Sequence, residues 1–219
     1  MDADGAAPSG VGSRPDAPGA TPAAASDLFG AAVGLAEQYV SILAGRGVEW
    51  GLIGPRETER LWPRHVLNSL AVSGFVPDGS AVVDVGSGAG LPGIPLALAR
   101  PDLKITLLEP LERRAKFLQL AVDELGLAEH VRVIRGRAEE HKGRYDVVTC
   151  RAVAPLDRLL GWTAHLFQPG GRLVALKGQS AAVEVDALDR VLARRKLSGR
   201  VASVTPHPDV EETFVVVLS

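Results

Sequence analysis

The segment from Val82 to Gly93 constrains the fold of this chain more than any other part of the sequence. It reads VVDVGSGAGLPG, an apolar strand followed by a glycine-rich turn that opens a helix. Glycine allows positive φ angles and a close approach of the backbone to a ligand. In doubly wound α/β folds such a turn lies at the carboxyl edge of the sheet, where ligands bind. The segment therefore predicts a doubly wound sheet with a small-molecule site at this turn.

The rest of the chain after residue 80 supports the same fold class. Short apolar runs alternate with helical stretches, which is typical of parallel strands joined by crossover helices. The last two strands are joined by a short polar link, so we expect a hairpin and an antiparallel C-terminal strand on a seven-stranded Rossmann-like sheet. The expected strands are Ala81–Val85, Lys104–Leu108, Val131–Arg135, Tyr145–Cys150, Arg172–Lys177, Arg200–Thr205 and Thr213–Leu218, with helices near Leu91–Arg100, Glu112–Leu125, Leu156–Leu166 and Ala181–Arg195.

Helical segments precede the sheet. Ser26 and Asp27 are expected to cap a first helix that stops at Gly45 and Gly47, and Pro63 is expected to divide a second helical segment, residues 57–72, into two pieces. Residues 1–25 lack large apolar side chains, so we expect a disordered tail. We thus predict a single domain over 26–219, with a helical part at 26–73 and a Rossmann-like core at 80–219.

The composition indicates a cellular compartment and restricts the classes of partner. A single cysteine, Cys150, excludes an intramolecular disulfide and fits the reducing cytoplasm. Apolar runs such as Ile94–Ala99 are much shorter than the ~20 residues of a membrane span, and the histidines show no metal-ligand spacing. The net charge of −2 gives no general attraction to nucleic acids, so RNA binding would need a local basic face. Basic residues gather at Arg113, Arg114 and Lys116, at Arg132, Arg135 and Arg137, and at Arg190, Arg194, Arg195, Lys196 and Arg200.

The glycine turn alone does not identify its ligand. Gly88-x-Gly90-x-x-Gly93 also matches the dinucleotide pattern, which is a weak signal by itself. The glycines begin two residues after Asp84, and the next strand ends in Glu109, 23 residues after Gly86, where a carboxylate could accept both ribose hydroxyls. These features favour S-adenosylmethionine, and NAD stays an alternative.

Four further groups follow strands or share a helix face, and each has a functional and a structural interpretation. In the functional interpretation Ala138-Glu139 contacts an adenine ring, and in the structural one Glu139 is a solvated charge. Arg151 either binds a carboxylate or phosphate or lies on the surface as an ordinary arginine. Lys177 would contact RNA phosphate or is a strand-end charge. His65 and Asn68 share a helical face that would line the cleft or pack in the interior.

Taken together, these residues resemble the bacterial ribosomal RNA guanine-N7 methyltransferase family RsmG, also called glucose-inhibited division protein B, over about residues 28–219. The resemblance implies a class I S-adenosylmethionine-dependent fold and methylation of a guanine N7 in 16S ribosomal RNA or the small ribosomal subunit. It implies cofactor contacts from Gly86, Leu91, Ala138, Glu139 and Arg151, to which our own analysis adds Asp84, Gly88 and Glu109. It places Lys177 and the Arg64-His65 pair toward the cleft and the RNA. The motifs that carry it are Arg64-His65-x-x-Asn68-Ser69, residues 84–95, Arg137-Ala138-Glu139, residues 150–154 and residues 175–178.

The resemblance also shapes the expected chemistry. Guanine N7 carries no proton that must leave, so no obligatory acid–base residue is expected and catalysis rests on positioning. We expect a cytoplasmic monomer without metal. Asn68, where the family commonly has an aspartate, and Pro63 are local departures. The alternatives are a methyltransferase of the same fold acting on a small molecule or protein, a non-catalytic RNA-binding assembly factor, and an NAD-dependent oxidoreductase.

Overall fold

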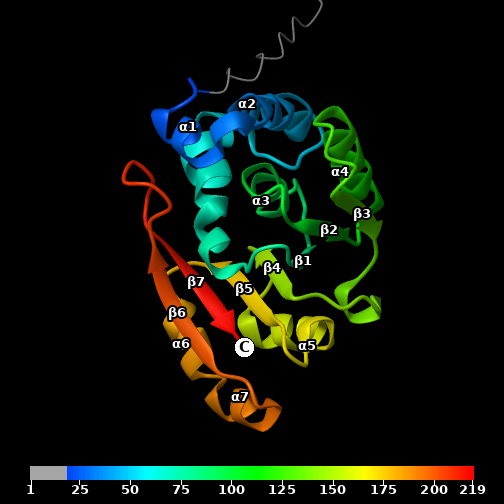
Figure 1. Ribbon diagram of the computed structural model, residues 1–219, viewed down its shortest axis with the longest axis vertical. Helices are drawn as coiled ribbons and strands as arrows, with labels where there is room; N and C mark the ends of the chain where they lie inside the picture. The colour runs from blue at the N-terminus through cyan, green and yellow to red at the C-terminus, as the bar shows by residue number, and fades with distance from the viewer. Residues whose placement is uncertain (1–18) are drawn as a thin grey trace, which may run out of the picture.

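A single seven-stranded sheet organises the computed structural model, which describes residues 19–219 (Figure 1). The strand order is β3-β2-β1-β4-β5-β7-β6, with β1 to β5 parallel and β7 antiparallel to both of its neighbours. This confirms the predicted doubly wound fold with an antiparallel C-terminal strand. The strands are β1 Ala81–Val85, β2 Lys104–Glu109, β3 Val131–Arg135, β4 Val147–Arg151, β5 Arg172–Lys177, β6 Gly199–Val204 and β7 Thr213–Leu218.

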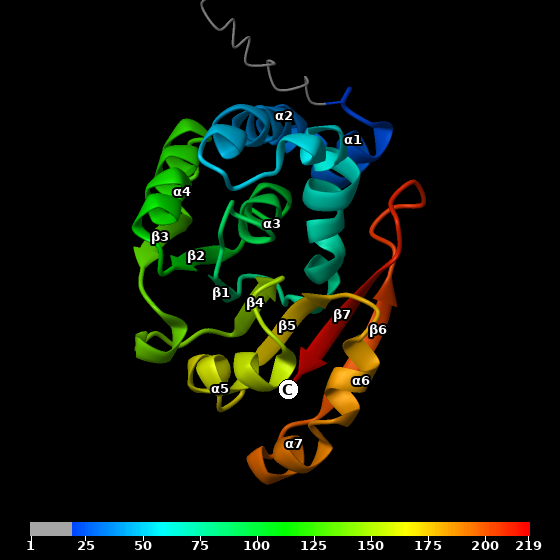
Figure 2. The ribbon, with the colours of Figure 1, turned by 180° about the vertical axis from the view of Figure 1, so that it is seen from behind.

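Two hydrophobic cores cover the two faces of the sheet, because successive side chains of a strand point to opposite faces. On β1, Val82 packs with the N-terminal helices, α3 and α4, whereas Val83 packs with α5, α6 and α7. Figure 2 shows the same two layers from behind. The α-helices are α1 Ala23–Phe29, α2 Val33–Ile42, α3 Gly93–Ala99, α4 Glu112–Glu124, α5 Leu156–Phe167, α6 Ala181–Asp186 and α7 Asp189–Arg195.

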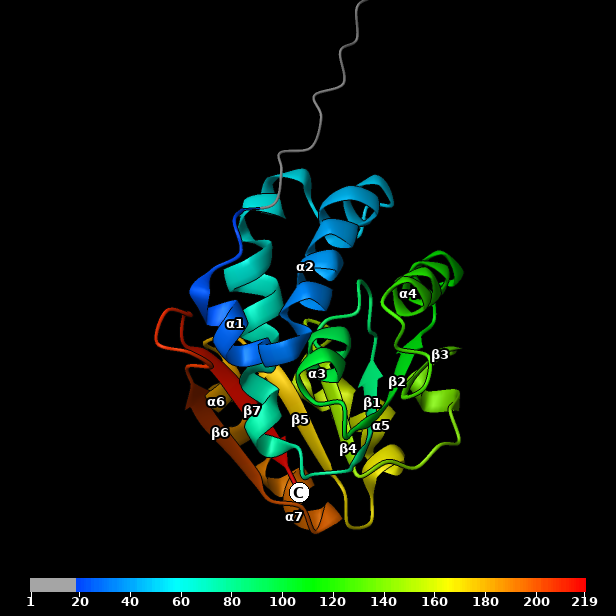
Figure 3. The same cartoon turned by 45° about the horizontal axis from the view of Figure 1, so that its top comes forward.

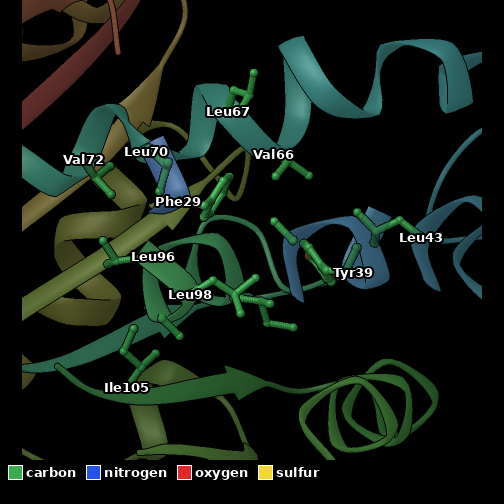
Figure 4. Close-up of a cluster of buried hydrophobic side chains, with 14 of the residues drawn as sticks. Phe29, Tyr39, Leu43, Val66, Leu67, Leu70, Val72, Leu96, Leu98 and Ile105 are labelled. Atoms are coloured by element: carbon green, nitrogen blue, oxygen red, sulfur yellow. The ribbon is translucent and has the colours of Figure 1, made fainter. Parts of the chain in front are cut away.

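The N-terminal helical part contains several tight or wide turns. The 3-10 segments are η1 Gly30–Ala32, η3 Pro55–Arg60 and η5 Leu70–Phe75, while η2 Leu43–Gly47 and η4 Leu61–Leu67 are π-helical; a further 3-10 turn, η6 Ala138–Glu140, follows β3. These N-terminal segments lie over α3 (Figure 3). Phe29 of α1, Tyr39 of α2, Leu43 of η2 and Leu67 of η4 meet Leu96 of α3 in one buried cluster (Figure 4). The helical part and the sheet therefore share one core.

The first helix begins earlier than we predicted. It starts at Ala23 with Pro22 in the N-cap position, so Ser26 lies inside the helix and caps nothing. Ala24 and Ala25 are 1 % and 0 % exposed, so the predicted tail boundary at residue 25 is wrong for these two residues. Alanine is small enough to pack into the core of the helical part, and the composition of the segment does not reveal such tertiary packing. Residues 1–18 of the predicted tail lie outside the described residues.

The first helix does not stop at the glycines where we expected, whereas the second segment is divided close to Pro63. The first helical run passes through Gly45 and Gly47 as a π-turn, and Gly47 allows close packing, since a Cβ there would lie 3.3 Å from Ile53 Cγ1. The second segment is divided at Arg60, where η3 ends, and Pro63 lies in the first turn of η4, as expected of a proline that restarts a helix. A π-turn shifts the backbone hydrogen bonds locally, and such turns are frequent at functional sites. The predicted last helix is instead divided into α6 and α7.

One helical run is longer and more apolar than the sequence analysis recognised. Residues Ala23–Gly47 have the length and mean hydropathy, 1.3, of a membrane span. Buried core helices pass the same test, and Phe29, Tyr39 and Leu43 of this run are 5 % exposed or less. Of its most apolar stretch 39 % is buried, and the buried side chains pack against α3 and η4.

Candidate functional site

The glycine turn between β1 and α3 adopts a conformation that only glycine tolerates well. Gly86, Gly88 and Gly90 have φ angles of +67°, +57° and +99°. A Cβ on Gly90 would lie 2.5 Å from Ile94 Cδ1, and one on Gly93 would lie 2.4 Å from Leu107 Cδ2. The turn therefore packs tightly against α3 and β2 and presents its backbone at the carboxyl edge of the sheet, as predicted. The side chain of Leu91 is half-buried there.

Asp84, the last but one residue of β1, lies beneath this turn and is 0 % exposed. Its Oδ2 accepts a hydrogen bond from the Gly93 N–H at 3.1 Å, while its Oδ1 has no hydrogen-bond partner within residues 19–219. Burial raises the pKa of Asp84 from 3.8 to about 7, against the opposing effect of the Gly93 hydrogen bond. A buried carboxylate oxygen without a partner is costly, so this atom favours a cationic or hydrogen-donating ligand.

Glu109 ends β2 beside the turn, as the sequence predicted. It is 1 % exposed; its Oε2 accepts from the Gly88 N–H at 2.9 Å, and its Oε1 accepts from the Leu111 N–H at 3.0 Å. Each carboxylate oxygen has two lone pairs, so both oxygens keep acceptor capacity. The structure therefore adds a second task to the predicted one, because Glu109 also holds the glycine turn in place.

The Ala138-Glu139 pair lies in η6, directly after β3. Ala138 is buried and packs with Leu108 and Tyr145. Glu139 has a side chain 42 % exposed, 4.0 Å from Arg137 Nη1. Its position fits the solvated-charge interpretation, and its predicted contact with an adenine amino group stays a prediction.

Arg151, at the end of β4, meets the helical segment that carries the Arg64-His65 pair. Its Nη1 donates to the His65 backbone oxygen at 3.0 Å, and its Nη2 donates to His65 Nδ1 at 2.7 Å. The structure thus brings together two predicted residues that are 86 positions apart in the sequence. Arg64 is the more exposed member of its pair, with a side chain 56 % exposed against 13 % for His65.

Glu57 completes this cluster and was missed by the sequence analysis. Its Oε2 lies 2.9 Å from His65 Nε2 and 3.5 Å from Arg64 Nη1. Glu57 therefore gives His65 and Arg64 a carboxylate partner, and Asn68 lines the neighbouring cavity. The sequence held no signal for Glu57, because a separation of eight residues brings two side chains together only through the particular turns of η3 and η4.

Lys177, at the end of β5, is largely buried rather than an exposed strand-end charge. Its Nζ donates to Glu184 Oε2 at 2.7 Å and to the Ala154 backbone oxygen at 2.8 Å, and its side chain is 11 % exposed. The carboxylate of Glu184 also accepts from the Leu156 N–H, so it ties the β5 end to the start of α5. This role of Glu184 was not predicted from the sequence.

A cavity of about 380 Å³ opens at the carboxyl ends of β4 and β5. It adjoins the glycine turn, because Val153 lines it and a Cβ on Gly86 would lie 3.0 Å from Val153 Cγ2. Within residues 19–219 no group of three or more His, Cys, Asp or Glu side chains is placed to hold a metal ion. The cavity is lined by Pro63, Arg64, Asn68, Cys150, Arg151, Ala152, Val153, Ala154, Leu176, Lys177, Gly178, Glu211, Glu212 and Thr213.

The basic clusters of the sequence do not converge on one rim. One lies on α4 and β3 at one edge of the sheet, and another lies on α7 and β6 at the opposite edge (Figure 1). Some members have local structural partners: Arg113 lies over the Trp50 ring at 6.0 Å, and Arg200 lies over the Phe75 ring at 5.2 Å. The cationic groups next to the cavity are instead Arg64, Arg151 and Lys177.

Comparisons with known proteins identify relatives over most of the chain. A protein of Mycolicibacterium smegmatis named Ribosomal RNA small subunit methyltransferase G is 54 % identical over 178 residues, which cover 79 % of this chain and 75 % of that one. A protein of the same name from Kineococcus radiotolerans is 50 % identical and covers 92 % and 81 %.

Solved structures with low sequence identity share the fold. The tRNA methyltransferase TrmK of B. subtilis has a TM-score of 0.52 at 18 % identity, covering 69 % of this chain and 64 % of that one. A precorrin-6y C5,15-methyltransferase of Geobacter metallireducens has a TM-score of 0.52 at 15 % identity, covering 69 % and 86 %. The family GidB, described as rRNA small subunit methyltransferase G, matches residues 33–207. With that match and relatives about half identical in sequence, the chain belongs to the rRNA small subunit methyltransferase G family.

Proposed function

We propose that this protein transfers the methyl group of S-adenosylmethionine to the N7 atom of a guanine in 16S ribosomal RNA. One observation carries the proposal: in a chain of this family, the cavity at the carboxyl ends of β4 and β5 lies directly beside the glycine turn. The turn suits the cofactor, and the adjoining cavity suits the base that receives the methyl group. The alternative is a small-molecule or protein substrate, which absence of label on the RNA in the experiment below would favour.

The residues around the turn fit S-adenosylmethionine, which carries an adenosine, a sulfonium and an amino-acid end. The unpartnered Asp84 Oδ1 suits a cationic ligand, and the free lone pairs of Glu109 suit the ribose hydroxyls. Gly86, Gly88 and Leu91 would present the backbone, with Ala138 and Glu139 toward the adenine. Arg151 would use its remaining N–H groups for the carboxylate of the amino-acid end. These assignments are proposals for this chain.

The cofactor would supply an electrophilic methyl group, so the protein has only to align it with the nucleophile. Asp84, Glu109 and Arg151 would hold the cofactor with its methyl carbon toward the N7 lone pair, and the electrons of the methyl–sulfur bond would stay on sulfur. No proton is removed at N7, so no general base is required. Alignment of this kind contributes roughly 7–11 kcal/mol in favourable cases. Arg64, which is exposed, would contact RNA phosphate; the partly buried His65 and Lys177 would shape the cavity.

The domain plan and the partners follow from the same proposal. A single methyltransferase domain over 26–219, extended by Ala23–Ala25, is supported by the core shared between the helical part and the sheet. The partner would be the small ribosomal subunit or its RNA, and the enzyme would act in the cytoplasm as a monomer without metal.

Transfer of labelled methyl from S-adenosylmethionine to small subunits that lack their native modifications tests the proposal. We expect label on one guanine N7, mapped by analysis of the isolated RNA. Cofactor binding without any label on the RNA would contradict the RNA substrate. Hydride transfer with a nicotinamide cofactor would contradict the reaction itself.

A further inference from the structure

Glu57, His65 and Arg151 form a chain of hydrogen bonds in which every donor is determined. An arginine guanidinium only donates, so His65 Nδ1, 2.7 Å from Arg151 Nη2, must be the acceptor. A neutral imidazole with an acceptor Nδ1 carries its proton on Nε2. That N–H faces Glu57 Oε2 at 2.9 Å, and an ionised carboxylate only accepts. The two partners therefore select one tautomer of His65.

We propose that Glu57 is a positioning residue, which fixes the tautomer of His65 and thereby holds the Arg151 guanidinium in place to contact the cofactor. This inference rests on the proposed function, because it assumes that Arg151 contacts S-adenosylmethionine. Histidine is held in the same way at many functional sites, where the partner of one ring nitrogen sets the chemistry of the other.

The contacts around Arg151 show why its orientation depends on His65. The His65 backbone oxygen and Nδ1 together accept from both Nη atoms, and Ser69 Oγ lies further away, at 3.5 Å from Nη1. Ser69 Oγ in turn donates to the same His65 oxygen at 2.6 Å. In the other tautomer, an Nδ1–H would point at an Arg151 N–H, and two donors would oppose each other. The guanidinium would then turn away from its present position.

The contact between Glu57 and Arg64 does not account for the arrangement. That pair is 3.5 Å apart and the Arg64 side chain is 56 % exposed, so solvent screens it and its contribution is small. The His65 ring, by contrast, is 13 % exposed and its bond to Glu57 is 2.9 Å long. The main partner of Glu57 is therefore His65.

Calorimetric titration with S-adenosylmethionine, on the full chain, provides the first test. We expect Glu57→Ala to weaken binding on the order of tenfold, as for loss of one charge-assisted hydrogen bond. Glu57→Gln should restore most of the affinity, because its amide oxygen accepts from the Nε2–H. Glu59→Ala is the matched control, since Glu59 is exposed on the same η3 segment. Equal losses in Glu57→Ala and Glu57→Gln would overturn the tautomer argument.

A double-mutant cycle separates the chain of hydrogen bonds from a general effect of charge. In His65→Asn, the amide oxygen can accept from Arg151 in place of Nδ1, while the link to Glu57 is lost. Glu57→Ala should therefore change the affinity little in the His65→Asn background, although it weakens the parent. Equal effects of Glu57→Ala in both backgrounds would show that Glu57 acts independently of His65, contrary to the proposal.

Nitrogen NMR of the His65 ring gives a readout that does not depend on the cofactor. The parent should show an unprotonated Nδ1 and a protonated Nε2, and Glu57→Ala should shift the ring toward a mixture of tautomers. An Nδ1–H tautomer in the parent would refute the inference. If the parent bound no S-adenosylmethionine yet kept this tautomer, the proposed function would fail, whereas the hydrogen-bond chain would stand.

Discussion

Asp84 is the buried acid whose titration gives the sharpest test of the structure. A pKa raised from 3.8 to about 7 corresponds to about 4 kcal/mol of difference between the two protonation states. The folded chain holds this proton more tightly than the unfolded chain does. The free energy of unfolding contributed by Asp84 is therefore fully present below pH 3.8 and is lost as the pH rises through about 7.

Replacement of Asp84 by asparagine should remove this loss. Its amide oxygen can still accept from the Gly93 N–H, while the side chain stays neutral at every pH. We expect the stability of Asp84→Asn relative to the parent to increase by roughly 3 kcal/mol between about pH 4.5 and about pH 8. The remaining ~1 kcal/mol of the total has already been lost by the parent at the lower pH.

Urea unfolding of both proteins at several pH values measures this difference. Titrating groups that do not interact with Asp84 contribute equally to both proteins and cancel. One of these is His65, whose pKa is lowered mainly by burial, so that its contribution to stability is lost as the pH falls below the ordinary histidine value. Asp186→Asn, at an exposed position on α6, is the control for a change of net charge. A relative stability that did not vary with pH would refute the assignment of Asp84 as a desolvated acid.

Three further predictions concern the site and the N-terminus. Glu109→Ala should weaken S-adenosylmethionine binding by roughly 1.5–3 kcal/mol in a titration, and unchanged affinity would remove Glu109 from the site. Arg64→Ala should reduce RNA methylation more than it reduces cofactor affinity, because the exposed Arg64 side chain would contact RNA, and it should also lower the salt dependence of RNA binding. Equal losses of methylation and of cofactor affinity would contradict an RNA contact. Removal of residues 1–25 should lower the melting temperature, since it deletes the buried Ala24 and Ala25, whereas removal of residues 1–18 should not; equal melting temperatures for the two truncations would contradict this.

The sequence was sufficient for the sheet and for the turn that it presents. β1, β3, β5 and β7 have the predicted bounds, because apolar runs of strand length between glycine or proline stops leave few alternatives. β4 begins two residues later than predicted and extends to Arg151. The place of Glu109 beside Gly88 was also predictable, because parallel strands bring their carboxyl ends to one edge.

The helical part was less predictable, for a physical reason. The start and stop of the first helix were inferred from Ser26, Gly45 and Gly47, whose local preferences are worth only about 1 kcal/mol each. Burial of Ala24, Ala25, Leu43 and neighbouring side chains against α3 outweighs such preferences. Tertiary packing therefore decided where these helices begin, wind more loosely or continue.

The sequence by itself determined the fold class, the ligand edge and most of the polar residues near it. Only the tertiary structure decided how those residues are paired. Glu57 meets His65 across two irregular turns, Arg151 reaches His65 from 86 positions away, and Glu184 neutralises Lys177. Hydrogen bonds of this kind require separate elements to be placed to within a few tenths of an ångström, and spacing along the chain does not encode such placement.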